Sequence, residues 1–139
     1  MRNLLTLLVL CQFLTACAGV GSVDTAPNMD KVTRGFSESM RWADYPTAAT
    51  YVHVDVRHVF LEQFPEDDDL HIVESKTLSV VPQNEERAAA VYEMEYYRLP
   101  STRIKKWRWA QQWRFIQETE TQPGGWFIEN EPPKLPWDQ

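Results

Sequence analysis

The spacing of apolar residues divides the chain into a helical part followed by a strand part. Up to residue 63 the apolar positions recur every three or four residues, which is typical of helices packed on one face. The first helical face carries Val32, Phe36, Met40 and Ala43. Asp44-Tyr45-Pro46 ends this helix, because the residue before a proline avoids the helical conformation.

Two shorter helices are expected to follow. One covers residues 47–52, and the other covers residues 56–63 with Asp55 as its N-cap. The second of these would bury Val56, Val59 and Phe60. The acidic run that comes next, residues 66–69, has the composition of a solvated loop.

From Leu70 onward the period of the pattern changes to two, the spacing of a strand with one buried face. The turn signals between the alternating segments predict strands over residues 70–81, 88–99, 103–118 and 126–130. These strands follow the helices in one block, so they are expected to pair with each other as antiparallel neighbours.

The longest expected strand alternates between an aromatic and a polar face. The aromatic face carries Trp107, Trp109, Trp113 and Phe115, and the polar face carries Lys106, Arg108, Gln112 and Arg114. We expect the aromatic face to pack on the helix that bears Phe36 and Met40. Every second residue of a strand points to the same side, so the polar positions should face away from that core.

A hairpin centred on Pro100-Ser101 fixes which residues stand opposite each other. In that register Glu95 faces Lys106 and Glu93 faces Arg108 on the polar side. On the other side Met94 meets Trp107, and Tyr92 meets Trp109. One register therefore explains both faces of the hairpin.

Helices followed by a run of antiparallel strands define an α+β protein, with the N-terminal helices on one face of a curved sheet of about four strands. Residues 42–49 with Tyr51 and Phe60, and residues 113–115 followed by residues 124–128, resemble the NTF2-like/cystatin-like superfamily. The second segment, with Trp113-Arg114-Phe115 and then Gly124-Gly125-Trp126, is similar to the terminal hairpin of such domains. The resemblance implies the fold, and it leaves the activity open because members include isomerases, dehydratases and non-catalytic envelope proteins.

The N-terminal segment predicts export and a lipid anchor. A charged start is followed by an apolar run over residues 4–14, which is shorter than the about 20 residues of a membrane span. The tetrapeptide Leu14-Thr15-Ala16-Cys17 resembles the lipobox of bacterial lipoproteins, in which the cysteine becomes acylated after cleavage in front of it. An ordinary secretory signal is the alternative. The Ala18 that follows favours the outer membrane in a Gram-negative source, with the domain facing the periplasm.

The chain is therefore expected to have four parts. Residues 1–16 are the lipoprotein signal peptide, and residues 17–27 are the lipidated N-terminus with a flexible tether. Residues 28–131 form a single α+β domain, and residues 132–139 are a Pro-rich tail.

Composition narrows the classes of function. The formal net charge is −6, which disfavours general nucleic-acid binding. Cys11 leaves with the signal and Cys17 takes the lipid, so no thiol is left for a disulfide or a metal. His53, His58 and His71 do not have the spacing of a metal pair, and no cofactor motif is present in the sequence. We therefore expect no metal, no cofactor and no catalytic residue.

Two groups of residues could still form a functional site. Asp55, Glu93 or Glu95 could act as a general base beside Tyr92, Tyr96 or Tyr97, but the hairpin register offers Glu93 and Glu95 ion pairs instead. The second group is a set of cations that could bind an anionic phospholipid headgroup, lipopolysaccharide or an acidic envelope protein. Its members are Arg103, Lys106, Arg108 and Arg114. A salt-bridged, solvated face is the alternative for these cations.

The resulting expectation is a lipid-anchored envelope protein that acts as a non-enzymatic binding or assembly module. The alternative is a small NTF2-like enzyme or carrier with an apolar ligand cup. Its partners would be the membrane, through Cys17, and an envelope protein or anionic component. Self-association as a homodimer through the sheet stays open.

Overall fold

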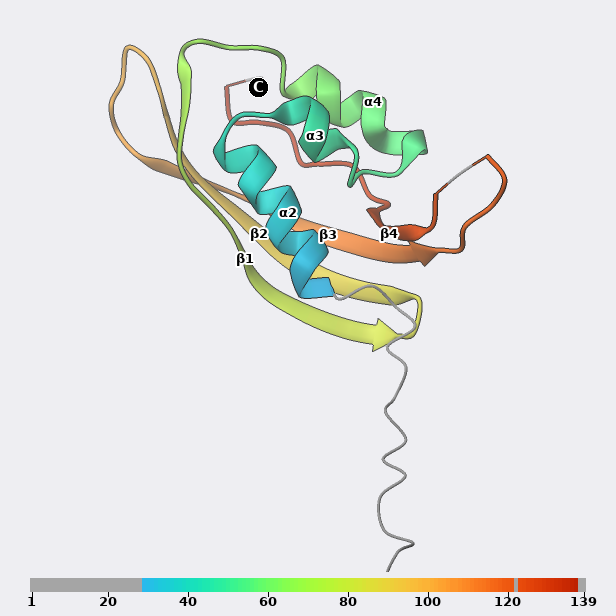
Figure 1. Cartoon of the computed structure of the whole chain (residues 1–139). Coiled ribbons are helices and arrows are strands. Elements are labelled where there is room, and N and C mark those ends of the chain that lie inside the picture. The colour runs from blue at the N-terminus through green and yellow to red at the C-terminus, as the bar shows by residue number, and fades with distance from the viewer. Residues whose placement is uncertain (1–28, 122, 138–139) are drawn as a thin grey trace, which may run out of the picture.

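The computed structural model describes residues 29–121 and 123–137, so the predicted signal, Cys17 and the tether lie outside the described residues. The described chain has an α+β fold in which helices pack on one face of a curved, open antiparallel sheet, as expected (Figure 1). The architecture is consistent with an NTF2-like/cystatin-like fold. The helices are α2 (Met29–Arg41), α3 (Tyr45–Ala49) and α4 (Val54–Gln63).

The helix boundaries differ from those expected because single capping residues decide them. Helix α2 ends at Arg41, and Ala43 adopts a left-handed φ of 55° and is exposed, so it does not belong to the buried face. Helix α3 begins at Tyr45 rather than residue 47. The Asp44 carboxylate accepts a hydrogen bond from Thr47 N at 3.1 Å, and Pro46 suits the first turn because its missing N–H would have no partner there.

Helix α4 is capped by His53, not by Asp55. The His53 Nδ1 atom accepts a hydrogen bond from Asp55 N at 3.4 Å. Asp55 lies in the first turn, where its negative charge interacts favourably with the positive end of the helix dipole. Of the three residues expected to be buried by this helix, Phe60 is fully buried. Val56 and Val59 are only half-buried, because α4 packs at the margin of the core.

The strands follow one another in the sheet order β1-β2-β3-β4. Their bounds are β1 (Leu70–Asn84), β2 (Arg87–Arg98), β3 (Lys105–Ile116) and β4 (Gly125–Ile128). The expected hairpin register is confirmed, with Glu95 opposite Lys106 and Glu93 opposite Arg108. Strand β1 continues past the expected end at residue 81 through Pro82, which an edge strand tolerates because one side of it needs no pairing.

Strand β1 is irregular. Its pairing with β2 shifts between Ile72 and Glu74, between Thr77 and Ser79, and between Pro82 and Asn84. At the first shift the Arg41 guanidinium donates a hydrogen bond to the Ile72 carbonyl at 2.8 Å. Helix α2 therefore holds the edge strand at a point where the regular ladder is interrupted.

The aromatic face of β3 packs on the helices, as the sequence predicts. Phe36 of α2 lies 6.0 Å from Trp109 and 6.4 Å from Trp113, measured between ring centroids. Trp107 instead contacts Phe64, at 5.7 Å, just beyond the end of α4. The face is thus covered by the whole helical layer and not by α2 alone.

A polar seam also joins α2 to the sheet. The Ser75 hydroxyl lies 2.6 Å from the Tyr92 hydroxyl and donates to the Ser37 carbonyl at 2.8 Å. Ser37 Oγ lies 3.3 Å from Thr77 Oγ1. These bonds satisfy hydroxyls that would otherwise be buried without partners, and they set the position of α2 along β1.

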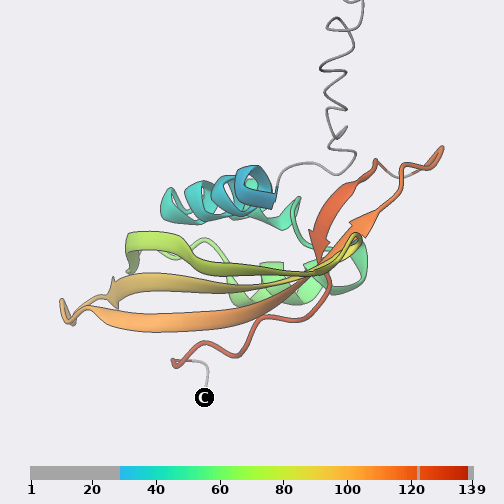
Figure 2. The ribbon, with the colours of Figure 1, turned by 90° about the horizontal axis from the view of Figure 1, so that it is seen from below.

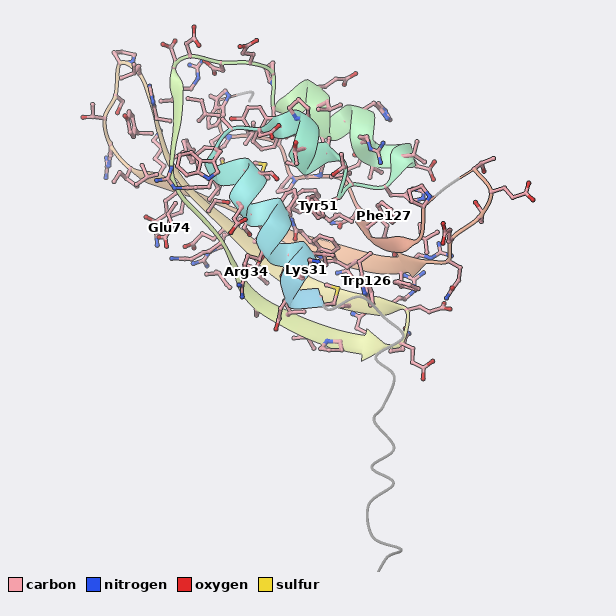
Figure 3. The ribbon with its side chains drawn as sticks, viewed as in Figure 1. Lys31, Arg34, Tyr51, Glu74, Trp126 and Phe127 are labelled. Atoms are coloured by element: carbon pink, nitrogen blue, oxygen red, sulfur yellow. The ribbon has the colours of Figure 1, made fainter. Side chains whose placement is uncertain are left out.

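Tyr51 connects the helical layer to the last strand. It lies between α2 and β4 (Figure 3), where its carbonyl accepts from Ile128 N at 2.9 Å. A side chain at Gly35 would collide with the Tyr51 hydroxyl, so the small residue permits the close approach of helix and ring.

The C-terminal segment returns along the sheet. The Asn130 side chain accepts from Gln112 N at 2.7 Å and donates to the Ala110 carbonyl at 2.9 Å, which continues the pairing of β3 beyond β4. Leu135 is fully buried, and Trp137 packs on Tyr96 at 5.0 Å between centroids. The core thus includes residues of the segment that the sequence assigned to a tail.

The filled core predicts a large difference between two tryptophan substitutions. Trp109→Ala should lower the free energy of unfolding by about 3–5 kcal/mol, because the lost transfer energy adds to the energy of the cavity. Trp42→Ala is the control, since Trp42 is 78% exposed, and it should change stability by under about 0.5 kcal/mol. Urea denaturation of both variants measures this, and similar losses for the two would contradict the packing described.

Candidate functional site

Within residues 29–121 and 123–137, one whole face of the sheet carries no helix. In Figure 2 no helix crosses in front of the strands, and the alternate residues of β3 from Lys106 to Arg114 are exposed while those between them are buried. We call this side the uncovered face. The confirmed register shows which residues of the three longer strands belong to this face. For example, it places Glu74, Glu95 and Lys106 in one row across the sheet.

A compact network of ion pairs occupies one part of the uncovered face. Lys106 Nζ lies 2.9 Å from Glu95 Oε1 and 3.5 Å from Glu93 Oε1, and Arg108 binds Glu93 at 2.7 Å through both Nε and Nη2. The two cations cover Glu93 so fully that its side chain is only 2% exposed. The Arg108 hydrogen bonds hold the pKa of Glu93 below its ordinary value of 4.5 against the opposing effect of burial.

The four cations of the predicted anionic-partner surface do not form one patch. Lys106, Arg108 and Arg114 lie on the uncovered face, and each has a carboxylate within 4.0 Å, that of Arg114 being Glu129. Arg103 lies before β3 begins, in the β2–β3 connection. The arrangement therefore resembles the salt-bridged face that the sequence also offered, with Arg103 apart from it.

Beyond the network the uncovered face of the curved sheet is built mostly of small side chains. In the register these positions stand side by side across three strands: Ser79, Val81, Ala89, Val91, Ala110 and Gln112. Val81 is 58% exposed and Ala110 is exposed as well. Such a surface offers contact area to a macromolecule.

The acid–base constellation considered from the sequence is not assembled. Glu93 and Glu95 lie on the uncovered face, whereas Tyr92 and Tyr96 alternate with them and point into the core. Tyr97 shares the carboxylates' face but stacks on His71 at 4.8 Å, and Asp55 lies on α4 beside His53. A carboxylate base and a tyrosine donor thus do not face a common cavity at β2.

The aromatic side of the sheet is packed solidly. Trp107, Trp109 and Trp113 are 5%, 1% and 1% exposed, and aromatic rings from α2 and α4 lie against them. Burial raises the pKa of Tyr92 well above its ordinary value, although its bond to Ser75 acts in the opposite direction. These residues act as a core and do not line an open cup.

A pocket that the sequence did not indicate lies at the β2–β3 hairpin. It has a volume of about 240 Å³ and is lined by residues of the hairpin together with Pro136 and Trp137. The basic run from Arg98 to Lys105 was visible in the sequence. The return of Trp137 to this end of the sheet had no periodic signal, so the pocket could not be found from the pattern.

The described residues hold no group of three or more His, Cys, Asp or Glu side chains arranged for a metal ion. Within the same ranges, no helix has the length and apolar character needed to cross a membrane. The chain matches no known family model, and no curated protein or solved structure is significantly similar to it. The described residues therefore define a class of fold, an α+β domain with one uncovered sheet face.

The Glu93 ion pairs predict a pH dependence of stability. Since the pKa of Glu93 is lowered in the folded protein, its carboxylate stabilises the fold above pH 4.5, and this contribution is lost as the pH falls through the lowered folded pKa. Glu93→Gln should remove that part of the acid sensitivity and leave Arg108 without its partner. Urea denaturation between pH 3 and 7, about the range where carboxylates titrate, measures the change.

The matched control is Glu95→Gln, which leaves Glu93 and Arg108 in place and should keep the Glu93 contribution. If both variants showed the same loss of stability with pH as the unsubstituted protein, Glu93 would not carry the effect.

Proposed function

We propose that this chain is a lipid-anchored cell-envelope protein, a non-enzymatic binding or assembly module that engages a protein partner through the uncovered face. The lipobox at residues 14–17 supports the anchor. The observation that carries the binding role is the contrast between the two sides of the sheet. One side is filled by the core, and the other is broad, exposed and free of helices over the described residues.

The charges on this face favour a protein over an anionic headgroup. Glu93 and Glu95 already neutralise Lys106 and Arg108, so a lone anion would have to displace a carboxylate held at 2.7–2.9 Å. A protein surface can instead contact the small side chains around Ala110 while its own polar groups meet the rim of the network. Interfaces of this kind combine an apolar centre with a polar rim.

The alternative is a small NTF2-like enzyme or carrier with an apolar cup. Such a cup would lie on the aromatic side of the sheet, where Trp107, Trp109 and Trp113 are almost completely buried by other rings. That packing supports the binding module over the carrier.

The anchor is tested at its cysteine. Cys17→Ser should abolish incorporation of a radiolabelled or alkyne-tagged fatty acid and leave the unprocessed precursor, because the thiol is the acyl acceptor of the motif. Labelling in bacterial cells followed by gel analysis measures both effects. Label that persists in Cys17→Ser, or is missing from the unsubstituted protein, would remove the lipoprotein assignment.

The binding surface is tested by photo-crosslinking from two exposed positions. A photoreactive phenylalanine at Ala110, on the uncovered face, should give a discrete crosslinked product in intact cells, and the same residue at Glu62 of α4 should not. A product of twice the chain's mass would assign the face to self-association. Equal crosslinking from both positions, or none from Ala110, would refute the proposed surface.

A further inference from the structure

The hairpin pocket lies on the opposite side of β3 from the ion-pair network. Tyr96 and Lys105 are partners in the register and belong to the core-facing set of positions, whereas Lys106 points to the uncovered face. The β2–β3 hairpin that lines the pocket lies at the end of the sheet away from the β1–β2 turn and the start of α2 (Figure 1). The pocket is therefore separate from the uncovered face.

The lining of the pocket is strongly basic. Arg98, Arg103 and Lys105 contribute to it, and no carboxylate does so among the residues that the structure describes. Arg98 Nε pairs with Asp67 at 3.2 Å outside the pocket lining, and its guanidinium lies 5.9 Å from the centre of the Trp137 ring. Among the described residues Arg98 forms an ion pair, whereas Arg103 and Lys105 form none.

A buried hydroxyl adds a hydrogen-bond donor. Tyr96, which lines the pocket, is 1% exposed, and its hydroxyl has no hydrogen-bond partner in the described part of the chain. A buried polar group without a partner is costly, so a ligand that accepts from it gains more than an ordinary hydrogen bond. Burial raises the pKa of Tyr96, which keeps the hydroxyl protonated and able to donate at neutral pH.

The size and chemistry of the pocket select a compact anion. Its volume of about 240 Å³ is below the about 300–1,000 Å³ typical of pockets for drug-sized ligands. Guanidinium and ammonium groups beside a hydroxyl donor are the groups that bind phosphoryl oxygens, because each oxygen can accept from more than one donor. Ser101, also in the lining, offers a further hydroxyl.

We propose that the pocket lined by Trp137 and the β2–β3 hairpin is a binding site for a phosphoryl group, held by Arg103, Lys105 and the Tyr96 hydroxyl. The site is independent of the partner surface proposed above, because it uses the opposite side of β3. The group is either free phosphate or the terminal phosphate of a lipid headgroup, and both present the same oxygens.

The test is calorimetric titration of the full chain, purified in a nonionic detergent, with inorganic phosphate and with short-chain, water-soluble phosphatidic acid. Ionic strength is held constant with chloride. We expect saturable binding of at least one of the two, and the preferred ligand identifies the source of the phosphoryl group. No saturable heat with either, up to about 10 mM, would overturn the proposal.

Two neighbouring lysines provide a matched pair of variants. Lys105→Gln should weaken binding about tenfold, since a charge-assisted bond is lost, whereas Lys106→Gln makes the same charge change on the other face and should leave the affinity unchanged. Equal weakening by both would show a diffuse charge effect and would refute the site.

Tyr96→Phe separates a ligand contact from a structural role. Removing an unpartnered buried hydroxyl should leave the melting temperature of the free protein unchanged or slightly higher, while the affinity for the ligand falls about fivefold. A variant that melts lower and binds normally would exclude the hydroxyl from the site. Crosslinking from Ala110 should be unaffected by Lys105→Gln, so the two proposals can fail separately.

Discussion

The arrangement of this domain depends on the aromatic packing around Phe36. Its ring lies within 5.1–6.4 Å of five other rings, which come from α4, the sheet and the segment before α4: Tyr51, Phe60, Tyr92, Trp109 and Trp113. Each such pair contributes about 0.5–1.5 kcal/mol beyond the burial of its area. By joining every layer at one point, Phe36 decides which side of the sheet is buried and so leaves the opposite side uncovered.

The sheet could be predicted because its information is local and periodic. Alternation along β3 separated Trp109 from Arg108, and the charges of Glu93 and Glu95 agreed with the same register. The starts of α3 and α4 were missed because one capping side chain decides each of them, and Asp44 and His53 carry no periodic signal. Leu135 was missed since its burial depends on contacts with distant strands.

The two candidate sites also differ in whether a local, periodic signal in the sequence predicts them. The neutral character of the ion-pair network follows from pairing that the sequence predicts. The phosphoryl site does not, because the strand expected from residue 103 begins only at Lys105, so the alternation does not tell on which side Arg103 lies. Only the fold brings Trp137 to Tyr96, about 40 residues away in sequence, and places it in the lining of the pocket at the basic hairpin.

The interruptions of β1 have a consequence for how copies of this domain meet edge to edge. A straight, exposed edge strand would let neighbouring sheets join into ribbons wherever copies come close, as they would under the proposed membrane anchor. The pairing shifts beside Val73, Leu78 and Gln83 leave these residues out of step with β2, so the outer edge of β1 is not a regular template. Copies that come close can therefore remain separate at this edge, which leaves the uncovered face of each copy accessible.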